Sequence, residues 1–238
     1  VSGLTEEMPY AVPNYLIDYV IRPTPVPLGV WRAINYTQNA FYKECFVDEM
    51  AHAAGIDPYQ FRRRLVRNNP KNLAVLDAAA KRAGWGTPPP PGIFRGIALN
   101  EACGSYCAQV AEVSVDDGHV RVHRVVAAID CGHVVNPLSI EMQTEGAVVY
   151  ALTATLFNEI TVRNGAAVQS NFNNYPMLRI GDVPQVETVI VPSGDFWGGV
   201  GEPSVPPTAP AVCNAVFAAT GKRIRSLPLQ NHDLRKAI

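Results

Sequence analysis

The stretch FRGIALNEACGSYCAQVAEVSVDDGHVRVHRVVAAID, residues 94–130, decides the fold class. Two apolar segments flank Asp117-Gly118, a dipeptide that strongly favours a two-residue hairpin turn. After this turn, Val120 and Val122 alternate with polar residues, as they do in a strand with one buried face. The stretch therefore predicts two long strands joined by one tight turn at residues 116–118.

The sequence before this stretch predicts helices. Apolar residues recur at helical spacing over residues 39–53, and Gly55 is a suitable stop. Asp57 and Pro58 have the residue types preferred at the N-cap and first position of a second helix. A third helix is expected over residues 72–84. Residues 15–21, YLIDYVI, indicate a strand, and prolines at residues 23, 25 and 27 favour an extended path after it.

The sequence after the stretch mixes helices and strands without a regular alternation. A long apolar helix is expected over residues 138–157, a second hairpin at Asn164-Gly165, a strand within residues 183–193 and a final helix that stops at Gly221. This order predicts the α+β class. The proline-rich linker GTPPPPG, residues 86–92, suggests two regions. Residues 1–87 would hold an extended segment and helices, and residues 88–238 an α+β portion.

Composition excludes several classes of function. Of the 238 residues, 47% are hydrophobic and 17% charged, and the formal net charge is -1. This balance gives no general attraction to nucleic acid or to an anionic membrane. The run Arg62-Arg63-Arg64 is therefore interpreted as a solvated helix face. The chain starts without Met, in the middle of a polar phrase, which suggests a mature product, a split subunit or a fragment.

The five cysteines are odd in number and show no disulfide framework. Cys103 and Cys107 form CxxxC, and His119 and His123 form HxxxH nearby, so a zinc site is one interpretation. Small buried cysteines are the other, because a four-residue spacing repeats one face of a strand and is common by chance.

One carboxylate, Glu202, lies in the glycine- and proline-rich stretch GGVGEPSVPPTAP just ahead of the final helix. The next charged residues are Asp195 and Lys222. Glycines let the backbone approach another group closely and expose its N–H groups. A carboxylate held beside such a loop in a dry cleft has the properties of a general base. A solvent-exposed loop glutamate is the alternative, and residue chemistry alone leaves both open.

Three further residues are candidates for chemistry. Arg32 follows PVPLGVW and would either bind an anion or stack on Trp31. Gln143 precedes an apolar helical segment, where its amide would donate to a ligand or simply lie on the helix surface. His133 is interpreted as a turn residue.

Five blocks of the sequence, taken in order, carry a family resemblance. They lie at residues 31–66, 104–137, 143–162, 169–179 and 198–229, and they include or overlap the motifs VWRAINYTQ, QTEG and GGVGEP. Together they resemble the C-terminal third of a large subunit of the molybdenum hydroxylases, the xanthine oxidase family. The branch is that of isoquinoline 1-oxidoreductase beta subunits and aldehyde dehydrogenases. The resemblance covers residues 10–232 and implies the C-terminal portion of a molybdopterin-binding domain.

The resemblance implies a function and a set of site residues. Glu202 matches the family's catalytic base beside molybdenum, and Arg32, Gln143, Gly199, Val200 and Gly201 match positions next to the cofactor. Ala33 and Asn35 replace glycines of the family loop, which leaves the detailed pterin contacts open. The implied reaction converts R–H and water to R–OH, two electrons and two protons, on an aldehyde or an N-heteroaromatic carbon. The implied cofactor is molybdopterin cytosine dinucleotide.

Partners follow from the same resemblance. The N-terminal part of such a subunit would supply the other pterin loops, from the same gene or a separate chain. Electrons would leave through [2Fe-2S] clusters on a small subunit, and a cytochrome c subunit is a further partner that the branch allows. The small-molecule substrate is the remaining partner, and no nucleic acid is expected. A periplasmic or inner-membrane-associated location is typical of the branch, with the cytoplasm as the alternative. A non-catalytic scaffold, an isolated fragment and an unrelated binding domain stay open as other interpretations.

Overall fold

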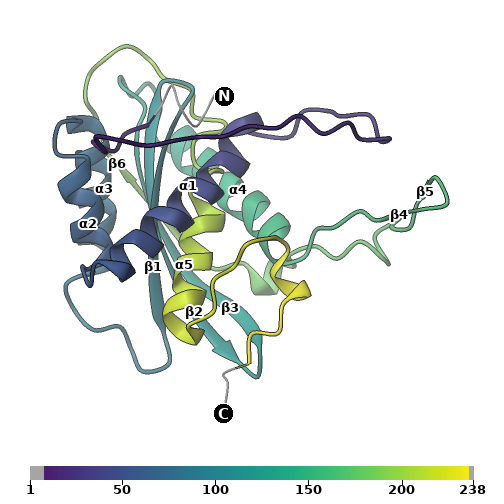
Figure 1. The fold of residues 1–238 in the computed structure, drawn as a ribbon. Coiled ribbons are helices and arrows are strands. Elements are labelled where there is room, and N and C mark those ends of the chain that lie inside the picture. The colour runs from purple at the N-terminus through teal and green to yellow at the C-terminus, as the bar shows by residue number, and fades with distance from the viewer. Residues whose placement is uncertain (1–7, 236–238) are drawn as a thin grey trace.

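A four-stranded sheet forms the centre of the computed structural model, which describes residues 8–235 (Figure 1). Its strands lie in the order β1 (Phe94–Ala102), β2 (Ser105–Asp116), β3 (His119–Asp130) and β6 (Gln185–Ile190). The first three are antiparallel neighbours, whereas β6 pairs with β3 in parallel. β3 and β6 therefore run in the same direction and finish at the same end of the sheet, and the loops that follow them start there.

Two-residue turns join the three antiparallel strands. Asp117 and Gly118 have φ values of 44° and 81°, which confirms the predicted hairpin. Cys103 and Gly104, with φ values of 54° and 73°, form a second turn. The prediction of one uninterrupted strand over residues 94–115 was therefore wrong. Two-residue hairpin turns need left-handed backbone conformations, which glycine adopts without strain, so Gly104 was the available signal.

Helices cover both faces of the sheet. α3 (Pro70–Ala83) packs on one face, and α4 (Pro137–Leu156) and α5 (Thr208–Thr220) pack on the other. α1 (Ile34–Ala53) lies beside β1 and α5, and α2 (Pro58–Leu65) packs against α1 and α3. The strands carry apolar runs because both of their faces are buried. The predicted α+β class is confirmed.

Local capping explains where the helices begin and end. The Asp57 carboxylate accepts a hydrogen bond from the Gln60 N–H at 2.9 Å, as predicted for the N-cap of α2. Gly84 and Gly221 end α3 and α5 in the left-handed conformation.

α5 crosses β1 at close range, at the position of Gly96. A Cβ on Gly96 would lie 2.2 Å from the Ala211 carbonyl oxygen, so only glycine permits this approach.

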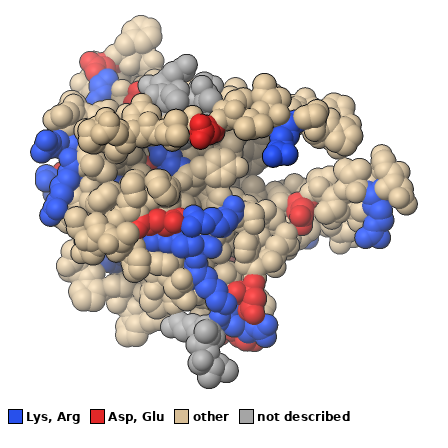
Figure 2. All heavy atoms as spheres, in the orientation of Figure 1, with Lys and Arg blue, Asp and Glu red and all other residues tan. Residues whose placement is uncertain are grey.

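Two arms extend from the same side of the body (Figure 1). The first is the segment 13–30, and the second holds the predicted hairpin, β4 (Val162–Arg163) and β5 (Ala166–Ala167). Both arms are mostly uncharged in Figure 2. The strand predicted at residues 15–21 was wrong: these residues pair with no strand in the described part of the chain, and Leu16 and Ile21 are exposed. The single turns η1 (Ile180–Asp182) and η2 (Leu229–Asn231) complete the elements.

The basic run in α2 is only partly solvated. Arg63 and Arg64 are exposed, but Arg62 is fully buried, so the prediction of a solvated face was wrong for this residue. Its Nε donates to Glu44 Oε2 at 2.9 Å, and its Nη1 lies 3.5 Å from Asp48 Oδ1. Burial by itself lowers the pKa of Arg62, but the charges of Glu44, Tyr10 and Asp48 and the hydrogen bond to Glu44 together outweigh this and leave the pKa above its ordinary value. The guanidinium is therefore a charged part of the core.

Candidate functional site

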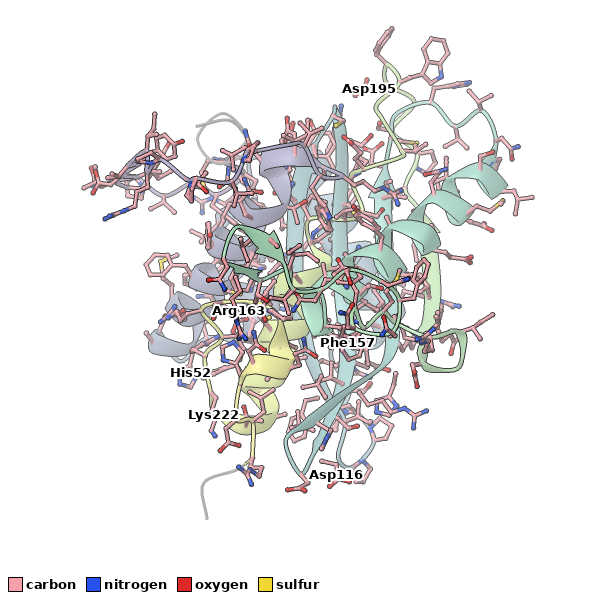
Figure 3. The ribbon with its side chains drawn as sticks, turned by 90° about the vertical axis from the view of Figure 1, so that its right-hand side faces the viewer. His52, Asp116, Phe157, Arg163, Asp195 and Lys222 are labelled. Atoms are coloured by element: carbon pink, nitrogen blue, oxygen red, sulfur yellow. The ribbon has the colours of Figure 1, made fainter. Side chains whose placement is uncertain are left out.

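The loop at residues 191–202 carries the candidate glutamate and lies across one end of the sheet. Backbone hydrogen bonds hold it in place, among them His133 N–H to Asp195 O at 2.9 Å, Gly198 N–H to Cys131 O at 2.9 Å and Gly199 N–H to Cys103 O at 2.8 Å. Figure 3 shows Asp195 at this end of the molecule and Asp116 at the opposite end. The loop is thus held by the Cys103-Gly104 turn and by the residues that follow β3.

Close backbone approach explains the first glycine of the loop. A Cβ on Gly198 would lie 2.2 Å from Ser105 Oγ and 2.5 Å from the Gly104 carbonyl oxygen. The Ser105 hydroxyl in turn donates to the Gly199 carbonyl at 2.6 Å. Because the loop lies directly against the Cys103-Gly104 turn, any side chain at residue 198 must displace either the loop or the turn.

We expect Gly198→Ala to lower the free energy of unfolding by about 1–3 kcal/mol, because the added methyl group overpacks this contact. Urea unfolding of the two proteins measures the difference. Gly181→Ala is the control, since a Cβ at Gly181 meets nothing within 4 Å. Equal stability of wild type and Gly198→Ala would contradict the close approach.

Three of the predicted site residues meet at the end of this loop. Arg32 Nε donates to the Gly201 carbonyl at 2.7 Å, and its Nη2 donates to the same oxygen. Nη2 also lies 3.2 Å from Gln143 Oε1. The tertiary structure therefore brings residues 32, 143 and 201 together from three separate segments. Gln143 contacts Arg32 through its amide oxygen. The interpretation of Gln143 as a simple helix-surface residue did not predict this contact.

Trp31 does not provide the stacking partner for Arg32 that the sequence suggested. It stacks instead on Tyr150 of α4, with the ring centroids 4.5 Å apart and the planes inclined by 28°. The Arg32 guanidinium lies over the same Tyr150 ring, at 5.7 Å from its centroid. The two consecutive side chains thus dock on one aromatic residue, which fixes the entry into α1 against α4.

The backbone next to Arg32 is strained. Ala33 and Ile34 have φ values of 69° and 44°, the left-handed region that β-branched residues in particular avoid. Ala33 is fully buried against Ala147, Ala151 and Val205. Such strain persists only where the surrounding structure enforces it, and it concentrates at functional sites. Here the two strained residues are the N-cap and the first residue of α1, next to Arg32.

Glu202 is half-buried, and its Oε2 lies 3.5 Å from Cys103 Sγ. Within residues 8–235, Glu202 forms no ion pair. In the same part of the chain, the N–H groups of Val200, Gly201 and Glu202 donate to no protein oxygen. Gly199 differs, because its N–H is taken by Cys103, and the Val200 side chain packs inward beside Ile140. The end of the loop thus combines a carboxylate with available backbone donors.

The zinc interpretation of the cysteines and histidines was wrong. Cys107 is buried in β2, where burial raises the pKa of its thiol to about 12. His119 lies opposite Asp116 at the far end of the sheet, and His123 pairs with the Ser114 hydroxyl at 2.7 Å. Among the described residues, no group of three or more His, Cys, Asp or Glu side chains is arranged to hold a metal ion.

The interpretation of the cysteines as small buried residues is confirmed for four of the five, and Cys103 is the exception. Cys45, Cys107, Cys131 and Cys213 are buried, but Cys103 is exposed because it occupies the turn rather than a strand.

His133 lies in a turn, as predicted, with its ring edge-on to Trp197 and the ring centroids 5.7 Å apart. None of the described helices is both long and apolar enough to cross a membrane.

Comparison with known proteins shows what this chain is similar to. Residues 95–184, from β1 to the residue before β6, match the molybdopterin cofactor-binding domain. The chain is 31% identical to isoquinoline 1-oxidoreductase subunit beta of Brevundimonas diminuta over 93% of its own length and 29% of the relative's. It is also 31% identical to a membrane-bound aldehyde dehydrogenase (pyrroloquinoline-quinone) of Gluconacetobacter polyoxogenes, over 96% of its own length and 32% of that protein's.

Solved structures agree on the fold. Quinoline 2-oxidoreductase from Pseudomonas putida superposes with a TM-score of 0.71 at 13% identity, over 81% of this chain and 50% of that one. The α+β sheet and its helices are therefore those of a molybdopterin-binding domain. The chain thus contains a match to the molybdopterin cofactor-binding domain, and it spans about a third of the length of the curated relatives it matches.

Proposed function

We propose that this chain carries the catalytic base, Glu202, of a molybdenum hydroxylase that oxidises an aldehyde or an N-heteroaromatic carbon with water as the oxygen source. The observation that carries the proposal is the meeting of Arg32, Gln143 and Gly201 directly beside Glu202. These residues come from separate blocks of the sequence that each resemble the family. Names of the relatives, such as isoquinoline 1-oxidoreductase, support the substrate classes.

The residues present fit a molybdenum cofactor. Phosphate, pterin and oxo oxygens accept hydrogen bonds, and the loop offers the N–H groups of Val200, Gly201 and Glu202 as donors. Gln143 adds its amide nitrogen, because its oxygen is already taken by Arg32. When bound, the cofactor, proposed to be the cytosine dinucleotide form, supplies the redox chemistry by accepting two electrons from the substrate. Arg32 holds the Gly201 carbonyl and thereby fixes where the donors point.

Glu202 acts in this proposal by accepting a proton at its carboxylate. Among the described residues no Lys or Arg neutralises it, so its negative charge is not already committed to an ion pair. Its neighbours in the sequence are glycines, prolines and the residues that lead into α5. A bound metal centre would provide the compensating positive charge. This explains the isolation of the acid in the sequence: a general base keeps its basicity when no basic side chain is paired with it.

We also propose that the rest of a large subunit and a small [2Fe-2S] subunit complete the enzyme. The matching relatives are about three times as long as this chain, and the name of the Brevundimonas protein describes it as one subunit of a larger enzyme. The two mostly uncharged arms support a covering partner, since Leu16 of the first is 82% and Val162 of the second 51% exposed in the structure.

Metal analysis of the native assembly tests the proposal. We expect molybdenum near one atom per assembly, together with iron and a second polypeptide region that carries the remaining cofactor loops. Plasma mass spectrometry measures the metals, and peptide mapping identifies the chains. An assembly without molybdenum that contained pyrroloquinoline quinone, the group in one relative's name, would overturn it. A folded chain with neither group would favour the scaffold interpretation.

A further inference from the structure

The thiol of Cys103 is the side-chain group in contact with the Glu202 carboxylate, with Sγ 3.5 Å from Oε2. We propose that Cys103 is a positioning residue that orients the base through this contact. The inference rests on the proposed function of Glu202, and it assigns a role to an exposed cysteine that the family resemblance did not include. Its geometry comes from the Cys103-Gly104 turn.

The turn is rigidly connected to the loop that carries Glu202. The Cys103 carbonyl accepts from the Gly199 N–H at 2.8 Å, three residues before the glutamate. Ser105, on the other side of the turn, donates to the Gly199 carbonyl at 2.6 Å. A Cβ at Gly199 would lie 3.1 Å from the Cys103 Cβ, so the two backbones are in close contact. The side chains at residues 103 and 202 are therefore held at a fixed separation.

The chemistry of a thiol suits this role. A thiol is a weak hydrogen-bond donor, so it orients one carboxylate oxygen without greatly stabilising the ionised form. Oε2 is occupied by the contact, which leaves Oε1 to accept a proton from the reacting group. A cationic side chain at residue 103 would fix the carboxylate more firmly but would also reduce its basicity.

Cys103 can be measured separately from the other cysteines. It is the exposed one of the five, and Cys45, Cys107, Cys131 and Cys213 are buried. The thiolate is the form that reacts with alkylating reagents, and a neighbouring negative charge disfavours it. The Glu202 charge should therefore slow alkylation of Cys103.

The first test is alkylation of the 238-residue chain with iodoacetamide at pH 8, followed by peptide mass spectrometry. We expect Cys103 to react about three- to tenfold faster in Glu202→Gln than in wild type, because the neighbouring charge is lost. Asp116→Asn removes a carboxylate at the far end of the sheet and should leave the rate unchanged. The buried cysteines should react only after denaturant is added, which checks folding. Equal rates in wild type and Glu202→Gln would overturn the inference.

The second test separates this inference from the proposed function. In the assembled enzyme we expect Cys103→Ala to lower kcat on the order of fivefold with KM unchanged, and Cys103→Ser, which keeps a donor, to restore most of it. Full activity of Cys103→Ala beside an inactive Glu202→Gln would refute the positioning role while leaving the proposed function standing. An active Glu202→Gln would instead refute the proposed function itself.

Discussion

The Glu202→Gln enzyme should retain its cofactor and lose nearly all turnover, with kcat lower by about 100- to 10,000-fold, the usual contribution of a general base. Glutamine keeps the shape of the side chain and its possible contact with Cys103 Sγ, but it cannot accept a proton. KM should change little, because the carboxylate is proposed to act on the reaction rather than on substrate binding. Steady-state kinetics of the assembled enzyme, normalised to molybdenum content, gives both constants.

Asp116→Asn is the matched control for this change. It neutralises another carboxylate in the same chain, but Asp116 lies opposite His119 at the end of the sheet away from the loop (Figure 3). Its kcat should remain within twofold of wild type, or about 0.4 kcal/mol. If Glu202→Gln worked as well as this control with normal molybdenum content, Glu202 would not be the base.

The Arg62→Met chain should be less stable than wild type by about 3–5 kcal/mol. Methionine fills much of the same volume but leaves the buried Glu44 carboxylate without its cation. Glu44 also accepts hydrogen bonds from Tyr10 at 2.8 Å and from the Leu99 N–H at 3.1 Å, so it cannot move to solvent. Guanidinium chloride unfolding, with linear extrapolation to water, measures the loss.

Arg64→Met is the corresponding control, since it makes the same substitution two residues away on the exposed side of α2. Its effect should stay within about 0.5 kcal/mol, as for most surface substitutions. A loss of less than about 1 kcal/mol in Arg62→Met would show that the buried ion pair contributes little to the fold.

The local elements of this fold are largely visible in the sequence. Asp57 and Pro58 mark the start of α2, Gly84 and Gly221 end their helices, and Asp117-Gly118 forms the expected turn. These features depend on backbone preferences of a few neighbouring residues, which the tertiary structure did not override. The family blocks likewise pointed to Glu202, Arg32 and Gln143 before any geometry was known.

Three features depended on contacts between distant residues and could not be predicted locally. Arg62 is buried because Glu44 and Asp48 of α1 pack against it, although its two arginine neighbours are solvated. The segment 15–21 has the composition of a strand, but no strand in the described chain lies beside it. Gly104 was only a weak local signal for the Cys103-Gly104 turn, whose position is fixed by the pairing of β1 with β2 that places Ala102 opposite Ser105.

The sequence by itself determined the α+β class, most helix boundaries and the resemblance to molybdopterin-binding proteins, because these follow from short-range preferences and from ordered motifs. Only the tertiary structure decided which of the candidate site residues contact one another. Arg32 reaches the Gly201 carbonyl across 169 positions of sequence, and Cys103 reaches Glu202 across 99. Such contacts arise when helices pack on both faces of the sheet and the glycine loop lies against its end. Because the residues in these contacts are far apart in the sequence, local sequence patterns do not predict the contacts.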